Sequence, residues 1–320
     1  MTQSLIVFDE PELEFRYGQR VSDPHDGLSL FGPFDADSSS SIGLSYIAIG
    51  TGEGLDLAEA WLGAVNKPAI VEAKEKEAPD LQLWPPYPGF EAAFNLPWPH
   101  RQMWGDCLNA TELSEAARIH DPYQRASEVV EQYLKGLDVA ASKLDQRPGV
   151  ALCVVPDEVY KNCRPESKVY KPVGEKVSKK EIAQRKKGQL DLFSEGIDLD
   201  IYHLSPDFRR QLKAKSMKHG IPIQIVREST LQLASKQKPG QRKLTPVSDR
   251  MWNLGTALYY MCGGKPWRLV TAREGVCYIG IAFKRADNGS TACCAAQMFL
   301  DNGDGIVFLG EFGPWYSKEK

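Results

Sequence analysis

The sequence predicts an α/β protein in which a doubly wound parallel sheet is followed by an antiparallel region. Strand-like apolar runs and helix-like periodic segments alternate between Ile42 and Val226, the pattern of a parallel sheet with crossover helices. Further along, one helical segment precedes three strand-like runs joined by hairpin signals, which is typical of an α+β domain. We therefore expect a lead-in segment (1–40), a parallel-sheet domain (41–244) and a second domain (245–320).

The composition is that of a soluble globular protein, with 42% hydrophobic and 25% charged residues in a chain of 320. The first fifteen residues lack a charged n-region, and no apolar run approaches the ~18 residues needed to span a bilayer. A cytoplasmic location is therefore expected. The seven cysteines are odd in number and lack CxxC spacing, which favours reduced core residues over zinc ligands or disulfides.

The charge is unevenly distributed along the chain. Residues 161–243 hold twenty Lys and Arg against nine acids, a net charge of +11. The whole chain carries −3, so the remainder carries −14. This separation favours a groove for a polyanion on an otherwise acidic body. For residues 178–188 the alternative is a flexible Lys-rich loop.

Three elements are predicted at the start of the chain. Residues 12–20 alternate as a short strand, and Pro and Gly at turn spacing follow them. Residues 42–50 predict a buried strand, and residues 55–65 predict a helix because their apolar residues recur at helical spacing. The turn TGEG (51–54) between them resembles a nucleotide-binding loop, although the GxGxxG spacing is absent.

The middle of the chain gives its clearest signals in a helix and a strand. Residues 83–104 are crowded with Pro and aromatic side chains, which predicts a packed irregular loop whose aromatics belong to the core. The helix predicted over 122–144 has one apolar stripe. A fully apolar strand over 148–155 follows, and a turn ends it.

Residues 197–224 predict a strand, a helix and a second strand. The apolar run to Leu204 is the first strand. Ser205 is the predicted N-cap, Pro206 the first helical residue, and Gly220 ends the helix before the second apolar run. This order predicts a parallel βαβ unit.

Two cations on this helix form the candidate site. Arg209 and Lys213 are four residues apart and therefore share one helix face, and Gln224 lies on the strand that returns beside them. Two cations and an amide at the carboxyl edge of a parallel sheet suit a phosphate group. The alternative is a solvated basic helix face, which is what most charged faces are.

The end of the chain predicts a helix and an antiparallel meander. The helix is capped by Ser248 and ends at Gly263 and Gly264. Its buried face is formed by Met251, Leu254, Leu258, Met261 and Cys262. Hairpin signals such as Asn288-Gly289 join strands predicted over 276–285, 291–300 and 305–311. A helix followed by such a meander opens the RNase H type of fold.

Several motifs occur together in a recognisable order. They are DPHDGLSLFGPFD, VVPDEVYKNCRP, FRRQLKAKSMKHGIPIQIVREST, and WNLGTALYYMCGGKPWRLV followed by YIGIAFKR. In these motifs the chain resembles short prokaryotic Argonautes over nearly its whole length. The resemblance implies a Rossmann-like MID domain that anchors the 5′-phosphate of a guide strand, followed by a PIWI domain of RNase H type.

The resemblance also implies the site residues. The family's MID pocket uses a helix residue, a lysine one turn later and a glutamine on the next strand, and these places are held here by Arg209, Lys213 and Gln224. Lys215 is implied as a weaker contact to the nucleic-acid backbone. A Mg²⁺ ion at the guide phosphate is a further implication of the family.

The chain departs from the family pattern at three points. A lysine in the last turn of the first PIWI helix is replaced by Met261, which leaves the pocket one cation short. Slicing members carry an aspartate on the first PIWI strand, where this chain has Ala282, and a methyl group cannot hold the divalent ions of two-metal cleavage. The sequence ends after the third PIWI strand, so both a natural truncation and a fragment stay open.

The leading expectation is therefore a guide-binding, non-slicing Argonaute subunit in plasmid or phage defence. By resemblance, the guide is short and 5′-phosphorylated, with RNA favoured, and the target is single-stranded invading DNA. The partner is a separate chain that joins an APAZ domain to a TIR, sirtuin or nuclease effector. Two alternatives stay open: a nucleotide- or cofactor-dependent enzyme that uses the TGEG turn, and a scaffold in which residues 161–187 dock an acidic protein.

Overall fold

The computed structural model divides the chain into two compact units, Ser41–Gly264 and Met1–Ser40 with Lys265–Lys320. The structure describes residues 10–37, 44–71, 84–99, 104–189, 198–233, 244–285, 291–301 and 304–308. No helix within these ranges is long and apolar enough to cross a membrane.

The larger unit is built on a parallel sheet in the order β4-β3-β5-β6. Its strands are β3 (Tyr46–Thr51), β4 (Trp104–Leu108), β5 (Val150–Val155) and β6 (Ile223–Arg227). All of β3 and β5 is buried, which agrees with their unbroken apolar runs. The predicted α/β class with a parallel sheet is confirmed. Because β4 lies on one side of β3 and β5 on the other, the strand order reverses between β3 and β5.

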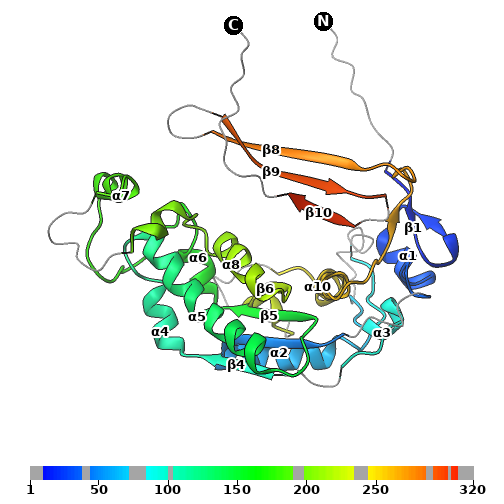
Figure 1. Cartoon of the computed structure of the whole chain (residues 1–320). Coiled ribbons are helices and arrows are strands. Elements are labelled where there is room, and N and C mark those ends of the chain that lie inside the picture. The colour runs from blue at the N-terminus through cyan, green and yellow to red at the C-terminus, as the bar shows by residue number, and fades with distance from the viewer. Residues whose placement is uncertain are drawn as a thin grey trace, which may run out of the picture. The chain divides into compact units, whose positions relative to one another are not determined.

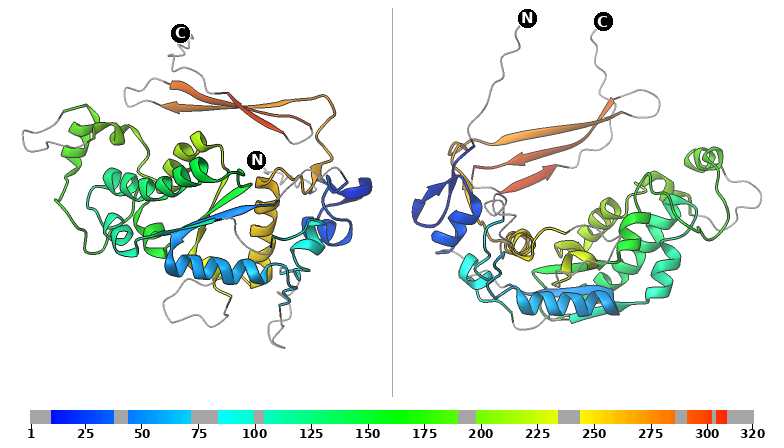
Figure 2. Two further views of the ribbon diagram at one scale, coloured as in Figure 1. Left: turned by 60° about the horizontal axis from the view of Figure 1, so that its bottom comes forward. Right: turned by 180° about the vertical axis from the view of Figure 1, so that it is seen from behind.

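Helices cover both faces of this sheet (Figures 1 and 2). On one face α5 (Pro122–Lys143) and α8 (Phe208–Ser216) pack against alternate residues of the strands, such as Ile49, Cys153 and Ile223. On this face the chain also forms α4 (Ala110–Ala116) and α6 (Asp157–Asn162). The other face is covered by α2 (Gly52–Ala64).

The strand predicted up to Leu204 is wrong. Residues Leu199–His203 form the 3-10 helix η4, whose N-cap Asp198 accepts from the backbone N–H of Asp200 at 2.9 Å. Tyr202 of this turn packs against Tyr123 of α5 rather than entering the sheet. The strand that pairs in parallel with β6 is therefore β5, and the βαβ unit is longer than expected.

The start of α8 also differs from the prediction. The N-cap is Asp207, whose carboxylate accepts from the backbone N–H of Arg210 at 3.1 Å, and Ser205 and Pro206 precede the helix. The predicted end is confirmed, because the 3-10 helix η5 (Met217–His219) is followed by Gly220 in the left-handed region at φ +59°.

Several short elements were not predicted. They include α1 (Pro24–Leu30), β4, α4, α6 and the basic helix α7 (Lys179–Lys186). Each of the helices among them has at most eight residues, so its apolar period is too short to read from sequence. The sequence WGDCL of β4 is half polar, and its identity as a strand depends on pairing with β3.

The aromatic residues of the segment predicted as a loop are core residues, as expected. Tyr87 and Phe94 are fully buried and contact Trp252 of α10 (Val247–Met261) edge to face. The neighbouring short helix is α3 (Phe90–Phe94). The helix α10 therefore belongs to the parallel-sheet unit. This unit ends at Gly264, whereas the expected domain boundary followed residue 244.

The described residues of the smaller unit form two antiparallel sheets. The first has the order β2-β1-β7 and consists of β1 (Leu13–Glu14), β2 (Arg20–Val21) and β7 (Arg268–Leu269). Between β1 and β2 lies the 3-10 helix η1 (Arg16–Gly18). Buried Phe15 packs against Gly27, where a Cβ would lie 2.1 Å from the ring, so α1 needs glycine there.

The second sheet of this unit is the predicted meander, in the order β10-β9-β8. Its strands are β8 (Tyr278–Arg285), β9 (Thr291–Phe299) and β10 (Gly305–Phe308). The expected antiparallel pairing is confirmed. Among the cysteines that the structure describes, all free, only Cys153 and Cys163 are buried, whereas Cys107 and Cys277 are exposed.

Candidate nucleic-acid interface

The helix α8 is held on the sheet by its apolar side. Phe208 and Leu212 are buried in the core with α5, and the Phe208 N–H donates to the Cys163 carbonyl at the end of α6 at 3.0 Å. Because these contacts fix one side of the helix, Arg209 and Lys213 are left exposed on another. The predicted sharing of one helix face by these two cations agrees with the structure.

The orientation of α8 follows from a third cation, Lys215. Its Nζ lies 2.6 Å from the Glu131 carboxylate of α5, which fixes the flank of α8 that faces α5. At ~100° per residue, Lys215 lies roughly 200° round the helix from Lys213, so Arg209 and Lys213 occupy the flank turned away from α5. Lys215 thus has a carboxylate partner, although its predicted role as a weaker backbone contact stays a prediction.

Gln224 lies on β6, which is the edge strand of the sheet, and is half-buried. Its neighbours Ile223 and Ile225 pack on the face covered by α5 and α8, so the alternation of strand residues directs Gln224 to the opposite face. Arg209 and Lys213 therefore approach the open edge from one face and Gln224 from the other. Among the described contacts, no hydrogen bond joins Gln224 to either cation.

Beside the carboxyl end of β3 lies a half-buried acid that sequence analysis did not identify, Glu228, the residue after β6. Thr51 caps α2 by accepting from the Gly54 N–H at 3.1 Å, and its hydroxyl donates to the Glu228 carboxylate at 2.8 Å. Burial raises the pKa of Glu228, and Glu53 and Asp157 nearby raise it further. A carboxylate at the start of α2 opposes a phosphate there, so this geometry lends no support to the nucleotide-binding alternative for the TGEG turn.

A second cluster at this edge surrounds Tyr160. The guanidinium of Arg227, the last residue of β6, lies 4.1 Å from the Tyr160 ring centroid and forms a 2.8 Å ion pair with Asp157. The exposed Arg164 guanidinium lies 4.3 Å from the same ring and donates to the tyrosine hydroxyl at 2.8 Å. Sequence analysis missed Arg164 and Arg227 because they lie far apart in the chain and only the fold brings them together.

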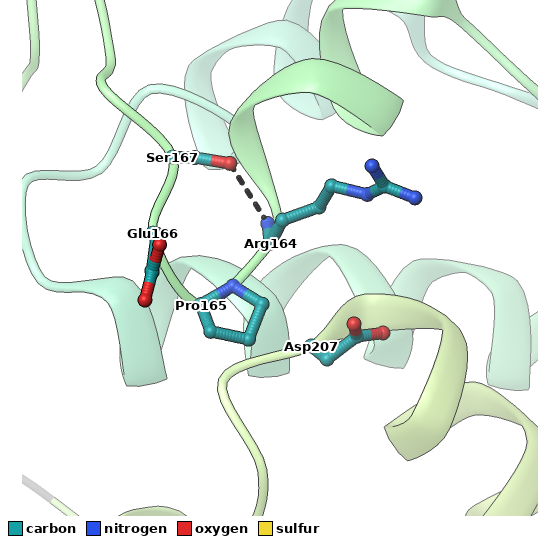
Figure 3. A pocket seen from close by; sticks show the side chains of 5 residues that line it. All are labelled: Arg164, Pro165, Glu166, Ser167 and Asp207. Atoms are coloured by element: carbon teal, nitrogen blue, oxygen red, sulfur yellow. Dashed lines mark hydrogen bonds between the residues drawn. The ribbon is translucent and has the colours of Figure 1, made fainter. Parts of the chain in front are cut away.

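An open hollow of about 470 Å³ lies beside the start of α8 (Figure 3). It is lined by Arg164, Pro165, Glu166, Ser167 and Asp207. The turn keeps its shape because the Arg164 N–H donates to the Ser167 hydroxyl at 3.1 Å. With two carboxylates and one guanidinium, the hollow is not a phosphate pocket by itself.

Met261 and Ala282, the two residues at which the sequence departs from the pattern it resembles, lie on α10 and β8. Met261 is the last residue of α10 and is half-buried. Ala282 lies within β8 and pairs with Ala295 of β9, and its side chain lies outside the described residues. In the described ranges, no three His, Cys, Asp or Glu side chains gather to hold a metal ion. The Mg²⁺ implied by resemblance stays a prediction.

No protein-family model matches the chain, and no curated protein matches it.

Proposed function

We propose that the protein is the guide-binding, non-slicing subunit of a short prokaryotic Argonaute defence system. The observation that supports this most is the placement of Arg209 and Lys213 on the flank of α8 away from α5, with Gln224 on the adjoining edge strand. Two exposed cations one turn apart provide donors for the terminal phosphate of a guide.

Phosphate binding explains this choice of residues. A terminal phosphate carries close to two negative charges, and a guanidinium donates to two of its oxygens at once, whereas the lysine acts as a point charge. Each charge-assisted hydrogen bond contributes about 1.5 to 3 kcal/mol.

In this proposal the protein reads no bases itself. Pairing between the guide and single-stranded invading DNA carries the sequence information, so the protein needs backbone contacts, and the net charge of +11 over residues 161–243 suits them. The guide is RNA by resemblance. Because Ala282 stands where slicing members have an aspartate, the proposed subunit carries out no cleavage step. A partner chain with an APAZ domain and a TIR, sirtuin or nuclease domain supplies the effector activity.

Removing both α8 cations tests the pocket. Arg209→Ala with Lys213→Ala is expected to weaken binding of a 5′-phosphorylated oligonucleotide by at least about 100-fold, because two charge-assisted hydrogen bonds are lost. The slope of log affinity against log salt should fall by about 1.4, or about 0.7 for each lost contact to a single strand. Fluorescence anisotropy at several salt concentrations measures both quantities.

The same titration with a 5′-hydroxyl oligonucleotide isolates the phosphate. The wild-type protein should prefer the phosphorylated end and the double variant should not. Arg210→Ala with Lys218→Ala removes equal charge from the same segment but from other flanks, and should preserve the preference. An unchanged preference in the Arg209 and Lys213 variant would refute the pocket.

A further inference from the structure

Residues 164–187, here called the basic arm, form a projecting segment rich in exposed cations. These include Lys168, Lys171, Lys176, Lys179, Lys180 and Lys187. The helix α7 within the arm has no buried residues and begins at a capping box formed by Ser178 and Glu181. Ile182 packs against Tyr123 and Tyr202, but most of the arm, its cations included, faces solvent.

The arm is nevertheless attached to the rest of the parallel-sheet unit at several points, including Val173 and Arg185. Val173 exchanges backbone hydrogen bonds with Arg118 and His120, at 2.8 and 3.0 Å. Arg185 of α7 forms a 3.0 Å ion pair with the buried carboxylate of Asp121 and donates to the Tyr202 hydroxyl at 2.7 Å. Exposed cations on a segment held at several points lose less entropy on binding than cations on a free loop.

An exposed aromatic ring stands among these cations. Tyr170 is 81% exposed, and the Lys171 Nζ lies 5.6 Å from its ring centroid. Lys171 has φ +53°, a left-handed conformation that costs energy for a residue with a side chain. The adjoining contact of Val173 with residues 118–120 holds the backbone there, so ring and ammonium are presented together.

We propose that the basic arm is a second nucleic-acid contact, which binds a single-stranded segment. Tyr170 stacks on an unpaired base, and Lys168 and Lys171 contact the flanking phosphates. Cations alone would suit any polyanion, but a solvent-exposed ring adds affinity for a strand whose bases are unstacked, because every base offers a π face. An acidic protein would use the lysines and would not need the ring. This inference does not require the phosphate pocket on α8.

The test uses the whole chain and a short oligothymidine with a 5′-hydroxyl end, which the α8 pocket does not favour. Tyr170→Ala is expected to weaken binding at least about fivefold, because stacking on one base is lost. Tyr170→Phe retains the ring and should bind as the wild type does. Tyr17→Ala is the matched control, since Tyr17 is also exposed, at 69%, and also has a cation over its ring, the Arg16 guanidinium.

The lysines are tested by salt dependence. Lys168→Gln with Lys171→Gln should lower the slope of log affinity against log salt by about 1.4. Lys135→Gln with Lys143→Gln removes equal charge from exposed positions on α5 and should leave the slope unchanged. All six positions are exposed, so circular dichroism should show an unchanged fold.

Two further probes separate the possible ligands. A duplex of the same length should bind without any dependence on Tyr170, because its bases are already stacked. Poly-L-glutamate represents an acidic protein and should bind more weakly than the oligothymidine. The proposal is overturned if Tyr170→Ala leaves oligothymidine binding unchanged, if Tyr170→Phe is as weak as Tyr170→Ala, or if polyglutamate shows the same loss on Tyr170→Ala.

Discussion

At the scale of single residues, Glu228 shows how the fold places an acid where it is only partly exposed to solvent. Its carboxylate accepts from the Thr51 hydroxyl and lies 3.1 Å from where a Cβ of Gly54 would be, a tighter contact than most Cβ atoms make. Burial raises the pKa of Glu228 above its ordinary value of 4.5, and the hydrogen bond from Thr51 only partly opposes this.

This pKa predicts a pH dependence of stability. An acid whose pKa is higher in the folded state holds its proton more tightly there, so the folded state loses this advantage as pH rises from the ordinary value through the raised one. Glu228→Gln removes the titration and keeps an oxygen for Thr51. The variant should match the wild type near about pH 4 and be more stable near about pH 8.

Urea unfolding at several pH values measures this difference. Glu128→Gln changes an exposed acid on α5 and serves as the control, which should follow the wild type throughout. Parallel pH profiles for the wild type and Glu228→Gln would contradict the assignment of a raised pKa to this carboxyl.

At the scale of secondary-structure elements, Asp121 joins three of them. One carboxylate oxygen caps α5 by accepting from the backbone N–H of Tyr123 at 2.8 Å, and the other accepts from Arg185 of α7 and from the Tyr202 hydroxyl of η4. The side chain is only 1% exposed, so its charge is compensated by these donors. The attachment of α7 therefore depends on a residue that is not in the arm.

Substitution of Asp121 should separate the two roles. Asp121→Asn retains a capping oxygen but loses the ion pair with Arg185, so amide hydrogen exchange in Lys179–Lys186 should accelerate while α5 stays protected. Asp121→Ala loses the cap as well and should cost about 1 kcal/mol more. Exchange followed by mass spectrometry reports both helices in one experiment.

Arg118→Ala is the control for this experiment. It removes a side chain that donates to the Ser114 hydroxyl and makes no contact with α7 among the described hydrogen bonds. If the backbone amides of α7 exchanged at the wild-type rate in Asp121→Asn, the ion pair between Asp121 and Arg185 would not be what holds α7 in place.

At the scale of the whole molecule, α10 belongs with the residues that precede it. Arg250 donates to the Thr230 and Gln232 carbonyls, the latter at 2.8 Å, and Trp252 donates from Nε1 to the Pro86 carbonyl at 3.1 Å. Tyr259, which is fully buried, stacks on Phe94. These contacts hold α10 inside the unit Ser41–Gly264.

The division into units predicts which fragments fold. Residues 41–264 should unfold cooperatively on heating, whereas 41–244 should melt at a clearly lower temperature, because it exposes the aromatic core that α10 covers. Loss of a buried Trp alone costs about 3 to 5 kcal/mol, which Trp252→Ala in the whole chain should reproduce. Equal melting temperatures for the two fragments would place α10 with the residues that follow it.

Long periodic segments could be read from sequence, and short ones could not. The 22 residues of α5 and the apolar run of β5 carry enough repeats to specify their structure before any tertiary contact forms. The run ending at Leu204 suits a strand or a turn equally. Its Tyr202 bonds Asp121, 81 residues earlier in the chain, and that contact decides for the turn.

The sequence by itself determined the parallel α/β class, the meander and the common face of Arg209 and Lys213, because each depends on local period and spacing. Tertiary structure alone decided that this face turns away from α5 and that Gln224 lies on the opposite side of an edge strand. It also brought Thr51 to Glu228 and Tyr160 to Arg227. These pairs join segments that are distant in the sequence, and the packing of helices on the sheet fixes them. No local sequence pattern contains that information.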